Sequence, residues 1–109
     1  MINNVYKVEY TGVVALAHTL APNLDFRIKE IRVHLSAAGG AGNLTATVDA
    51  IGGVVYDINL LTQDMTAVTD LVYIPDGEGI TLFKGDEIDF AWANAGGKSY
   101  GLVVVYEVV

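Results

Sequence analysis

The sequence predicts an all-β fold, a single antiparallel β-sandwich over residues 1–109, and three observations carry this prediction. Apolar residues recur with a period of two rather than the helical period of 3.6. Val, Ile, Thr and Tyr dominate the runs between glycine-containing breaks, as they do in strands. These runs follow one another about every 8 to 12 residues, a spacing typical of a sandwich or barrel. A chain of 109 residues also has room for only one hydrophobic core.

About eight or nine short strands are expected. They are placed at residues 5–10, 13–20, 26–35, 44–50, 54–61, 67–74, 80–83, 87–94 and 100–108. In the third strand the apolar phase changes between Ile28 and Ile31, which indicates a β-bulge near Lys29 and Glu30. A strand that begins only at about Ile31 explains the same pattern, and both interpretations stay open at this point.

A hairpin is predicted between the fourth and fifth strands, with residues 51–53 as a three-residue loop. This register places four apolar pairs on one face: Ala50–Val54, Val48–Tyr56, Ala46–Ile58 and Leu44–Leu60. A two-residue loop at Gly52 and Gly53 would mix polar and apolar residues on both faces. We therefore prefer the three-residue loop, in which Gly53 supplies a left-handed residue.

The last two strands are also predicted to form a hairpin, across a loop at residues 95–99. The core-facing pairs would be Trp92–Leu102, Phe90–Val104 and Ile88–Tyr106. The residues that then face outward are Ala91, Ala93, Gly101, Val103 and Val105. A strand with one solvated face should alternate with polar residues there, and this hairpin does not.

The uninterrupted apolar run at residues 100–106 is typical of a strand that is buried on both faces. A two-layer sandwich covers only one face of a strand with its own second sheet. The sequence therefore predicts that Ala91, Ala93, Gly101, Val103 and Val105 form an oligomer interface. Cover by the N-terminal strand or by residues 13–20 of the same chain is the alternative.

Composition excludes several classes of function. Thirteen acidic against six basic residues give a net charge of −7, which argues against a nucleic-acid partner. There is no cysteine, hence no disulfide, no Cys-based zinc site and no thiol nucleophile. No secretory signal is apparent, and no uncharged stretch reaches the roughly 20 apolar residues of a membrane span, so no membrane partner is expected.

Two acidic, glycine-containing loops, at residues 76–79 and 84–87, could bind calcium through oxygen ligands. Neither has the spacing of an EF-hand loop, and Asp and Gly are also the ordinary residues of tight turns, which is the preferred interpretation. Asp86 and Asp89 could be a pair of glycosidase carboxylates, but nothing in the sequence fixes their separation. No metal site is predicted.

The remaining candidates also favour structure over chemistry. His18 and His34 lie among apolar residues without a triad or ligand pattern, and we interpret both as structural or interface side chains. Residues 39–42 are rich in glycine but lack the ending of a phosphate loop. Trp92 and the six tyrosines could stack on sugars, yet most fall on the predicted core phase. The sequence predicts no catalytic residue, no cofactor and no enzyme activity.

Two resemblances to known families add to this interpretation. The segment LFKGDEI at residues 82–88, followed by an alternating strand, a Gly-containing loop and YGLVV at 100–104, resembles the last hairpin of trimeric jelly-roll domains of the tumour necrosis factor and complement globular-head type. This likeness covers about the last quarter of the chain. It implies a β-sandwich of jelly-roll type, a Gly-Asp turn before the penultimate strand, and a final strand near a threefold axis.

The second resemblance covers most of the chain, over residues 26–35, 43–61 and 72–106. The pattern IxVxLSA at 31–37, followed by NLT at 43–45 and KGDEID at 84–89, is similar to small structural proteins of bacteriophage heads and tails. It carries no catalytic motif. It implies a role in the virion without saying which. The absence of cysteine fits assembly in the reducing cytoplasm of the host.

Together these lines predict a capsid decoration or cement protein that forms a homotrimer, contacts the major capsid protein and stabilises the shell by many weak contacts. The alternative is a tail fibre or baseplate module that binds host-surface glycans. Its binding loops would be residues 39–42, 95–99 and 76–79.

Overall fold

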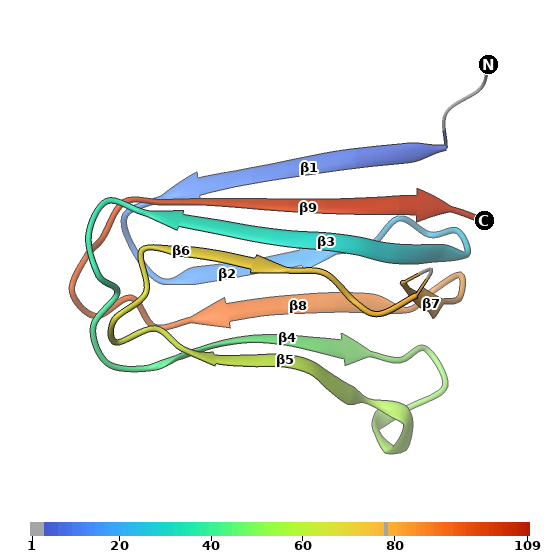
Figure 1. Ribbon diagram of the computed structural model, residues 1–109. Helices are drawn as coiled ribbons and strands as arrows, with labels where there is room; N and C mark the ends of the chain where they lie inside the picture. Colours follow the sequence, from blue (N-terminus) through green and yellow to red (C-terminus); the bar gives the residue numbers. More distant parts are fainter. Residues whose placement is uncertain (1–3, 78) are drawn as a thin grey trace.

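Two antiparallel β-sheets pack face to face in the computed structural model, which describes residues 4–77 and 79–109 (Figure 1). The predicted all-β sandwich is therefore confirmed. The elements are β1 (Val5–Gly12), β2 (Leu16–Leu20), β3 (Phe26–Leu35), β4 (Asn43–Asp49), the 3-10 helix η1 (Val54–Tyr56), β5 (Ile58–Asp64), β6 (Asp70–Tyr73), β7 (Ile80–Leu82), β8 (Glu87–Trp92) and β9 (Tyr100–Val108).

The chain changes sheet at most of its connections. The first sheet has the order β1-β9-β3-β6, and β7 pairs with the other half of β3 beside β6. The second sheet has the order β2-β8-β4-β5. Among the described residues, β4 and β5 are the only consecutive strands that pair with each other. We call the two layers the β1-β9-β3-β6 sheet and the β2-β8-β4-β5 sheet.

The core lies between the two sheets and follows the period-two pattern of the sequence. In β9 the buried residues are Tyr100, Leu102 and Val104, and in β8 they are Ile88, Phe90 and Trp92. Burial of one face of each strand supplies most of the free energy that holds the two layers together. The assignment of inward faces from the sequence is correct for both strands.

The β-bulge in β3 is confirmed. Ile28 is opposite Tyr106 of β9 and Glu30 is opposite Val105, so Lys29 is the extra residue between them. The extra residue restores the inward phase, because Ile28 and Ile31 are both fully buried although they are three positions apart. The strand begins at Phe26, which excludes the later start near Ile31.

The predicted hairpin of the last two strands is wrong. β8 lies between β2 and β4, whereas β9 lies between β1 and β3 in the opposite sheet. The connecting segment is organised by Asn94, which is buried. Its amide group donates to Val14 O and Lys98 O at 2.9 Å each, and its side-chain oxygen accepts from Lys98 N at 2.9 Å. The period-two pattern shows which face of a strand is buried but not which strand lies beside it. The predicted hairpin and the observed placement in opposite sheets therefore bury the same side chains.

The predicted register of the β4–β5 hairpin is also wrong, although the hairpin exists. Val48 pairs with Ile58 rather than with Tyr56, and a register irregularity separates Ala46 from Thr47. The connection is longer than three residues because η1 occupies it, and Asp57 accepts a hydrogen bond from Ala50 N at 2.9 Å. Gly53 does adopt a positive φ of 121°. As a result Val54, Val55 and Tyr56 leave the sheet and face solvent.

Candidate interaction surface

The five residues predicted as an oligomer interface do not form one patch. Ala91 is exposed on the outer face of the β2-β8-β4-β5 sheet, and Ala93 follows directly after that strand. Gly101, Val103 and Val105 lie on the outer face of the opposite sheet. A single contiguous surface made of both groups is therefore wrong, since the hairpin that would join them does not form. A role for either group in association stays a prediction.

Charged neighbours flank the two outward valines of β9. The register places Val103 between Glu9 and Arg32, and Val105 between Lys7 and Glu30. Ion pairs link Lys7 to Glu9 at 3.4 Å and Arg32 to Glu30 at 3.0 Å. Both valines are half-buried between these neighbours. Long charged side chains are able to cover apolar surface with their methylene stems. Cover for this strand comes largely from its own sheet.

The outer face of the other sheet carries short side chains. One row across the strands consists of Ala17, Ala91, Thr45 and Thr62, and the next of Thr19, Asp89, Thr47 and Asn59. The sequences of β2, β4, β5 and β8 contain no Lys or Arg. The strands of this face therefore offer short side chains and acidic groups but no basic groups.

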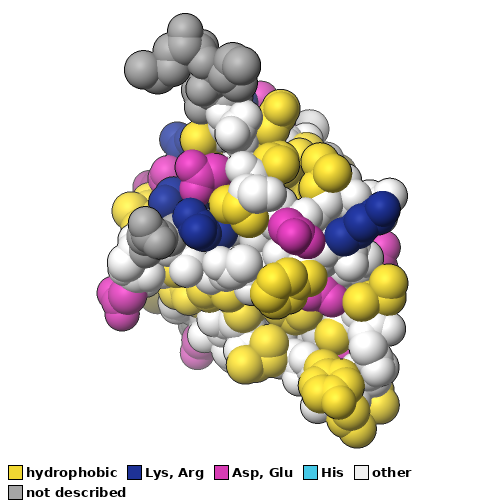
Figure 2. All heavy atoms as spheres, turned by 90° about the vertical axis from the view of Figure 1, so that its right-hand side faces the viewer, with side chains coloured by type: hydrophobic (Ala, Val, Ile, Leu, Met, Phe, Trp, Pro, Cys, Tyr) yellow, Lys and Arg dark blue, Asp and Glu magenta, His cyan; other side chains and the backbone are white. Residues whose placement is uncertain are grey.

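A group of exposed apolar residues lies at the end of the sandwich where η1 protrudes. We call it the η1 surface and define it by Ile51, Val54, Val55, Tyr56, Ile58 and Phe83, whose exposed fractions range from 58% to 81%. Figure 2 shows this end, with hydrophobic side chains gathered at its lower edge, where η1 lies in Figure 1. With roughly 200 Å² for a large apolar residue, the six expose on the order of 800 Å². The largest apolar patch on a typical monomer is only about 300–600 Å².

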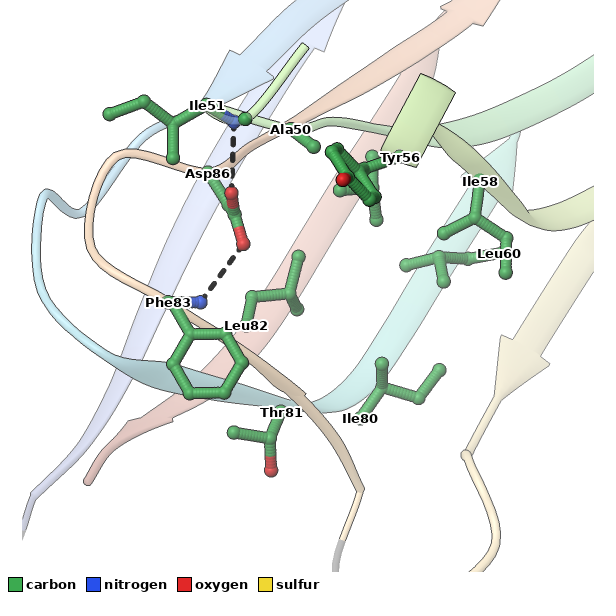
Figure 3. Close-up of a pocket in the computed structure, with 12 residues that line it drawn as sticks. Ala50, Ile51, Tyr56, Ile58, Leu60, Ile80, Thr81, Leu82, Phe83 and Asp86 are labelled. Atoms are coloured by element: carbon green, nitrogen blue, oxygen red, sulfur yellow. Dashed lines mark hydrogen bonds between the residues drawn. The ribbon is translucent and has the colours of Figure 1, made fainter. Parts of the chain in front are cut away.

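A cavity of about 470 Å³ opens within the η1 surface, at the edge of the sandwich where β5 faces β7 (Figure 3). Ile58 and Leu60 point into it from β5, and Ile80 from β7. Its complete lining is Val48, Ala50, Ile51, Gly52, Tyr56, Ile58, Leu60, Ile80, Thr81, Leu82, Phe83 and Asp86. Because only three of these carry polar side chains, the cavity favours an apolar occupant.

A carboxylate holds the mouth of the cavity together. Asp86 accepts hydrogen bonds from Ile51 N through Oδ1 and from Phe83 N through Oδ2, both at 3.0 Å (Figure 3). Its own backbone N–H donates to Phe83 O at 2.9 Å, which closes a turn. Gly85 in this turn has a φ of 95°, and a Cβ there would overlap the Ile51 side chain. The loop at residues 84–87 is thus a tight turn, as the sequence predicts, and it packs under the η1 surface.

Asp86 and Asp89 have separate structural roles. Asp89 accepts a hydrogen bond from the Thr19 hydroxyl at 2.7 Å on the outer face of the β2-β8-β4-β5 sheet. In the other acidic loop, Gly79 N donates to Asp76 O at 3.4 Å and Gly77 has a φ of 66°, so this loop is a turn as well. Glu78 lies outside the described residues. Within residues 4–77 and 79–109, no three His, Asp or Glu side chains are placed to hold a metal ion.

The two histidines have different surroundings. The His18 ring stacks on Tyr10, and its Nε2 is hydrogen-bonded to the Tyr100 hydroxyl at 2.8 Å. Burial, and then the neighbouring Tyr106, raise the pKa of Tyr10. His18 is therefore a structural side chain, as expected. His34 is exposed and its Nδ1 lies 2.5 Å from Asp70 Oδ1, so the apolar surroundings expected for it are wrong.

The aromatic residues divide between core and surface. Trp92 and Tyr100 are buried, and Tyr10, Tyr73 and Tyr106 are half-buried against the core. Tyr56 is exposed, which contradicts its assignment to the core phase, and Tyr6 is exposed and stacks on Tyr106.

The three loops of the glycan-binding alternative are not gathered at one place. Residues 39–42 and 95–99 lie at the same end of the sandwich, whereas residues 76–77 and 79 lie toward the opposite end (Figure 1). Next to the first two loops, Ser36 N donates to Ser99 O at 2.9 Å. A glycan site could therefore combine only the first two loops.

Comparison with known proteins does not assign the chain to a family, so the surface of the molecule is the main guide to its function. No protein-family model matches the chain, and no curated protein is significantly similar to it. No helix in the part of the chain that the structure describes is long and apolar enough to cross a membrane.

Proposed function

We propose that the chain is a structural protein of a bacteriophage virion, and within the virion a capsid decoration protein that stabilises the shell through contacts with its own copies and with the major capsid protein. The strand orders β1-β9-β3-β6 and β2-β8-β4-β5 support a sandwich of jelly-roll type, in which crossing connections join a five-stranded layer, with β7 beside β6, to a four-stranded layer. The resemblance of residues 31–37, 43–45 and 84–89 to phage head and tail proteins supports the location.

The η1 surface is the observation that carries a structural, assembling role. The backbone that presents its apolar side chains is held by hydrogen bonds before any partner arrives, because Asp86 and Asp57 anchor these loops. A preformed surface loses little conformational entropy on binding. Such a surface suits a protein whose task is to bind neighbours in a particle.

Co-sedimentation with purified capsids that lack decoration tests this proposal. Saturable binding at a fixed number of copies per capsid is expected. A chain that stays in the supernatant at every concentration would exclude the decoration role.

A host-glycan module of a tail fibre or baseplate is the second candidate, favoured by the proximity of residues 39–42 to residues 95–99. A glycan array separates the two proposals. Saturable binding to one sugar class, lost on substitution in these two loops, would favour the second.

A further inference from the structure

We infer that the η1 surface joins copies of this chain, and that Val54 and Val55 of one copy enter the apolar cavity between β5 and β7 of the next. This inference deepens the proposed function and rests on it for its biological setting. It replaces the outer faces predicted from the sequence with a different interface.

The projecting part of the contact is η1. Val54 and Val55 are 79% and 81% exposed, and no residue of η1 is buried. The segment is nevertheless held in shape, because Tyr56 N donates to Gly53 O at 3.0 Å and Asp57 N donates to Val54 O at 3.1 Å. Two adjacent valines are thus presented to solvent on a short, hydrogen-bonded turn.

The receiving part is the cavity, whose volume of about 470 Å³ is sufficient. A cavity of about 150 Å³ in a protein core accommodates benzene, so the space beside Leu60 and Ile80 can hold two isopropyl groups. Its wall is apolar, and the Asp86 carboxylate at its mouth is already hydrogen-bonded to Ile51 N and Phe83 N. Insertion of valine therefore leaves no buried charge without partners.

The exposed area identifies a second copy as the occupant. The η1 surface exposes on the order of 800 Å² of apolar residues, which is about what each partner contributes to a standard protein–protein interface. A small apolar ligand would fill the cavity but leave Val54 and Val55 in water. A second copy buries the projection and the cavity together, because both belong to the same chain.

Solution mass tests the inference. Light scattering of the unaltered chain is expected to give a mass that is a whole multiple of 11.6 kDa and at least twice that value. The variant Val54→Ser, Val55→Ser should fold normally, because both side chains are exposed, and its dissociation constant for self-association should rise about 100-fold. A single-chain mass for the unaltered protein at the highest attainable concentration would overturn the inference.

Two matched controls address specificity. Val13 and Val14 are 55% and 70% exposed and belong to the connection between β1 and β2, at the end of the sandwich opposite η1 (Figure 1), so Val13→Ser with Val14→Ser should leave the mass unchanged. Val103→Thr with Val105→Thr keeps the β-branched shape on the outer face of β9 and should also leave it unchanged. Loss of the oligomer in the β9 variant alone would overturn the inference in favour of that outer face.

A mixing experiment tests insertion into the cavity. Ile58→Asp places a charge on the cavity wall and leaves η1 intact, and circular dichroism checks that it folds. Each variant alone is expected to self-associate about 100-fold more weakly than the unaltered chain, and the mixture is measured at a concentration at which each variant alone is a monomer. An equimolar mixture of Ile58→Asp with Val54→Ser, Val55→Ser should form a dimer, because one intact projection meets one intact cavity. A mixture of folded variants that stays monomeric would overturn the insertion.

The outcome of the capsid-binding assay is independent of the outcome of these self-association tests. A monomeric protein that still saturates capsids would refute the interface between copies and retain the decoration role. If the protein forms an oligomer but does not bind capsids, the interface between copies is supported and the decoration role is refuted.

Discussion

At the scale of single residues, carboxylates act as anchors for the backbone of the loops. Asp86 accepts from two loops at once, Asp57 accepts from Ala50 N, and Asp25 accepts from Lys84 N at 2.8 Å. Acids near glycine are compatible with ion binding, catalysis or turns when only the sequence is known. The observed hydrogen bonds show that these acids stabilise turns and loops. Two of the donors, Ile51 N for Asp86 and Lys84 N for Asp25, are distant in sequence from the carboxylate that they bind.

Replacement of Asp86 by alanine should destabilise the protein. It removes the acceptor for Ile51 N and Phe83 N, and hydrogen bonds to a charged group contribute about 1.5–3 kcal/mol each. Because the site is partly open to water, we expect a total loss of about 2 kcal/mol in the free energy of unfolding, measured with urea. Asp76→Ala, in an exposed turn, is the control and should change it by less than about 0.5 kcal/mol. Equal effects of the two substitutions would contradict the anchoring role.

Asp64 provides a prediction about pH. The Thr66 hydroxyl, and then the Thr66 backbone N–H, lower the pKa of the Asp64 carboxyl below its ordinary value of 3.8. The folded state thus favours the ionised form, and this stabilisation is present above pH 3.8 and is lost as the pH falls through the lowered pKa. Thr66→Val should move the pKa of Asp64 upward toward 3.8, as followed by carboxyl NMR shifts. An unchanged titration curve would refute the role of the hydroxyl.

At the scale of elements, the sequence predicts where the strands lie but not which strands pair with each other. The bounds of β3 and β9 match the prediction residue for residue, since both are long runs rich in strand-forming residues. The pairing of β8 could not be predicted, because its connection to β9 crosses between sheets through the hydrogen bonds of Asn94. The same limit hid the η1 surface, since two glycines followed by Val54, Val55 and Tyr56 also fit a hairpin strand.

The Asn94 connection can be tested by two substitutions with different backbone costs. Asn94 is buried, makes three side-chain hydrogen bonds, and has a φ of 49°. Asn94→Ala and Asn94→Gly both remove the hydrogen bonds, but only alanine also pays about 1 kcal/mol for the left-handed conformation. We expect alanine to be the more destabilising of the two by about that amount in urea denaturation. Equal losses would mean that the backbone is free to relax.

At the scale of the whole molecule, the alternation between sheets sets the order in which contacts can form. Apart from the β4–β5 hairpin, strand pairs join segments that are distant in sequence, such as β1 with β9 over the full length of the chain. Distant pairs require large loops to close before they contribute any stability. Local structure therefore contributes little to the early stages of folding.

We expect slow refolding, in about milliseconds to seconds, as for other sandwiches of non-local topology. Trp92 is the single tryptophan and is buried in the core, so its fluorescence reports the closure of the two sheets. Stopped-flow dilution from urea measures the rate. Refolding in microseconds would show that local structure carries more of the stability than the topology suggests.

The pairing of β1 with β9 also determines how the molecule responds to tension. Val5 lies opposite Glu107, and Val108 N donates to Asn4 O at 2.9 Å, so the two outermost strand ends are adjacent at one end of the sandwich. A force that pulls these two ends apart would load the ladder one rung at a time and peel the strands open, rather than shear all rungs together. To withstand mechanical load in a particle, the protein would therefore need contacts on the broad faces of its sheets and on the projecting turn. The ends of β1 and β9 should not carry that load.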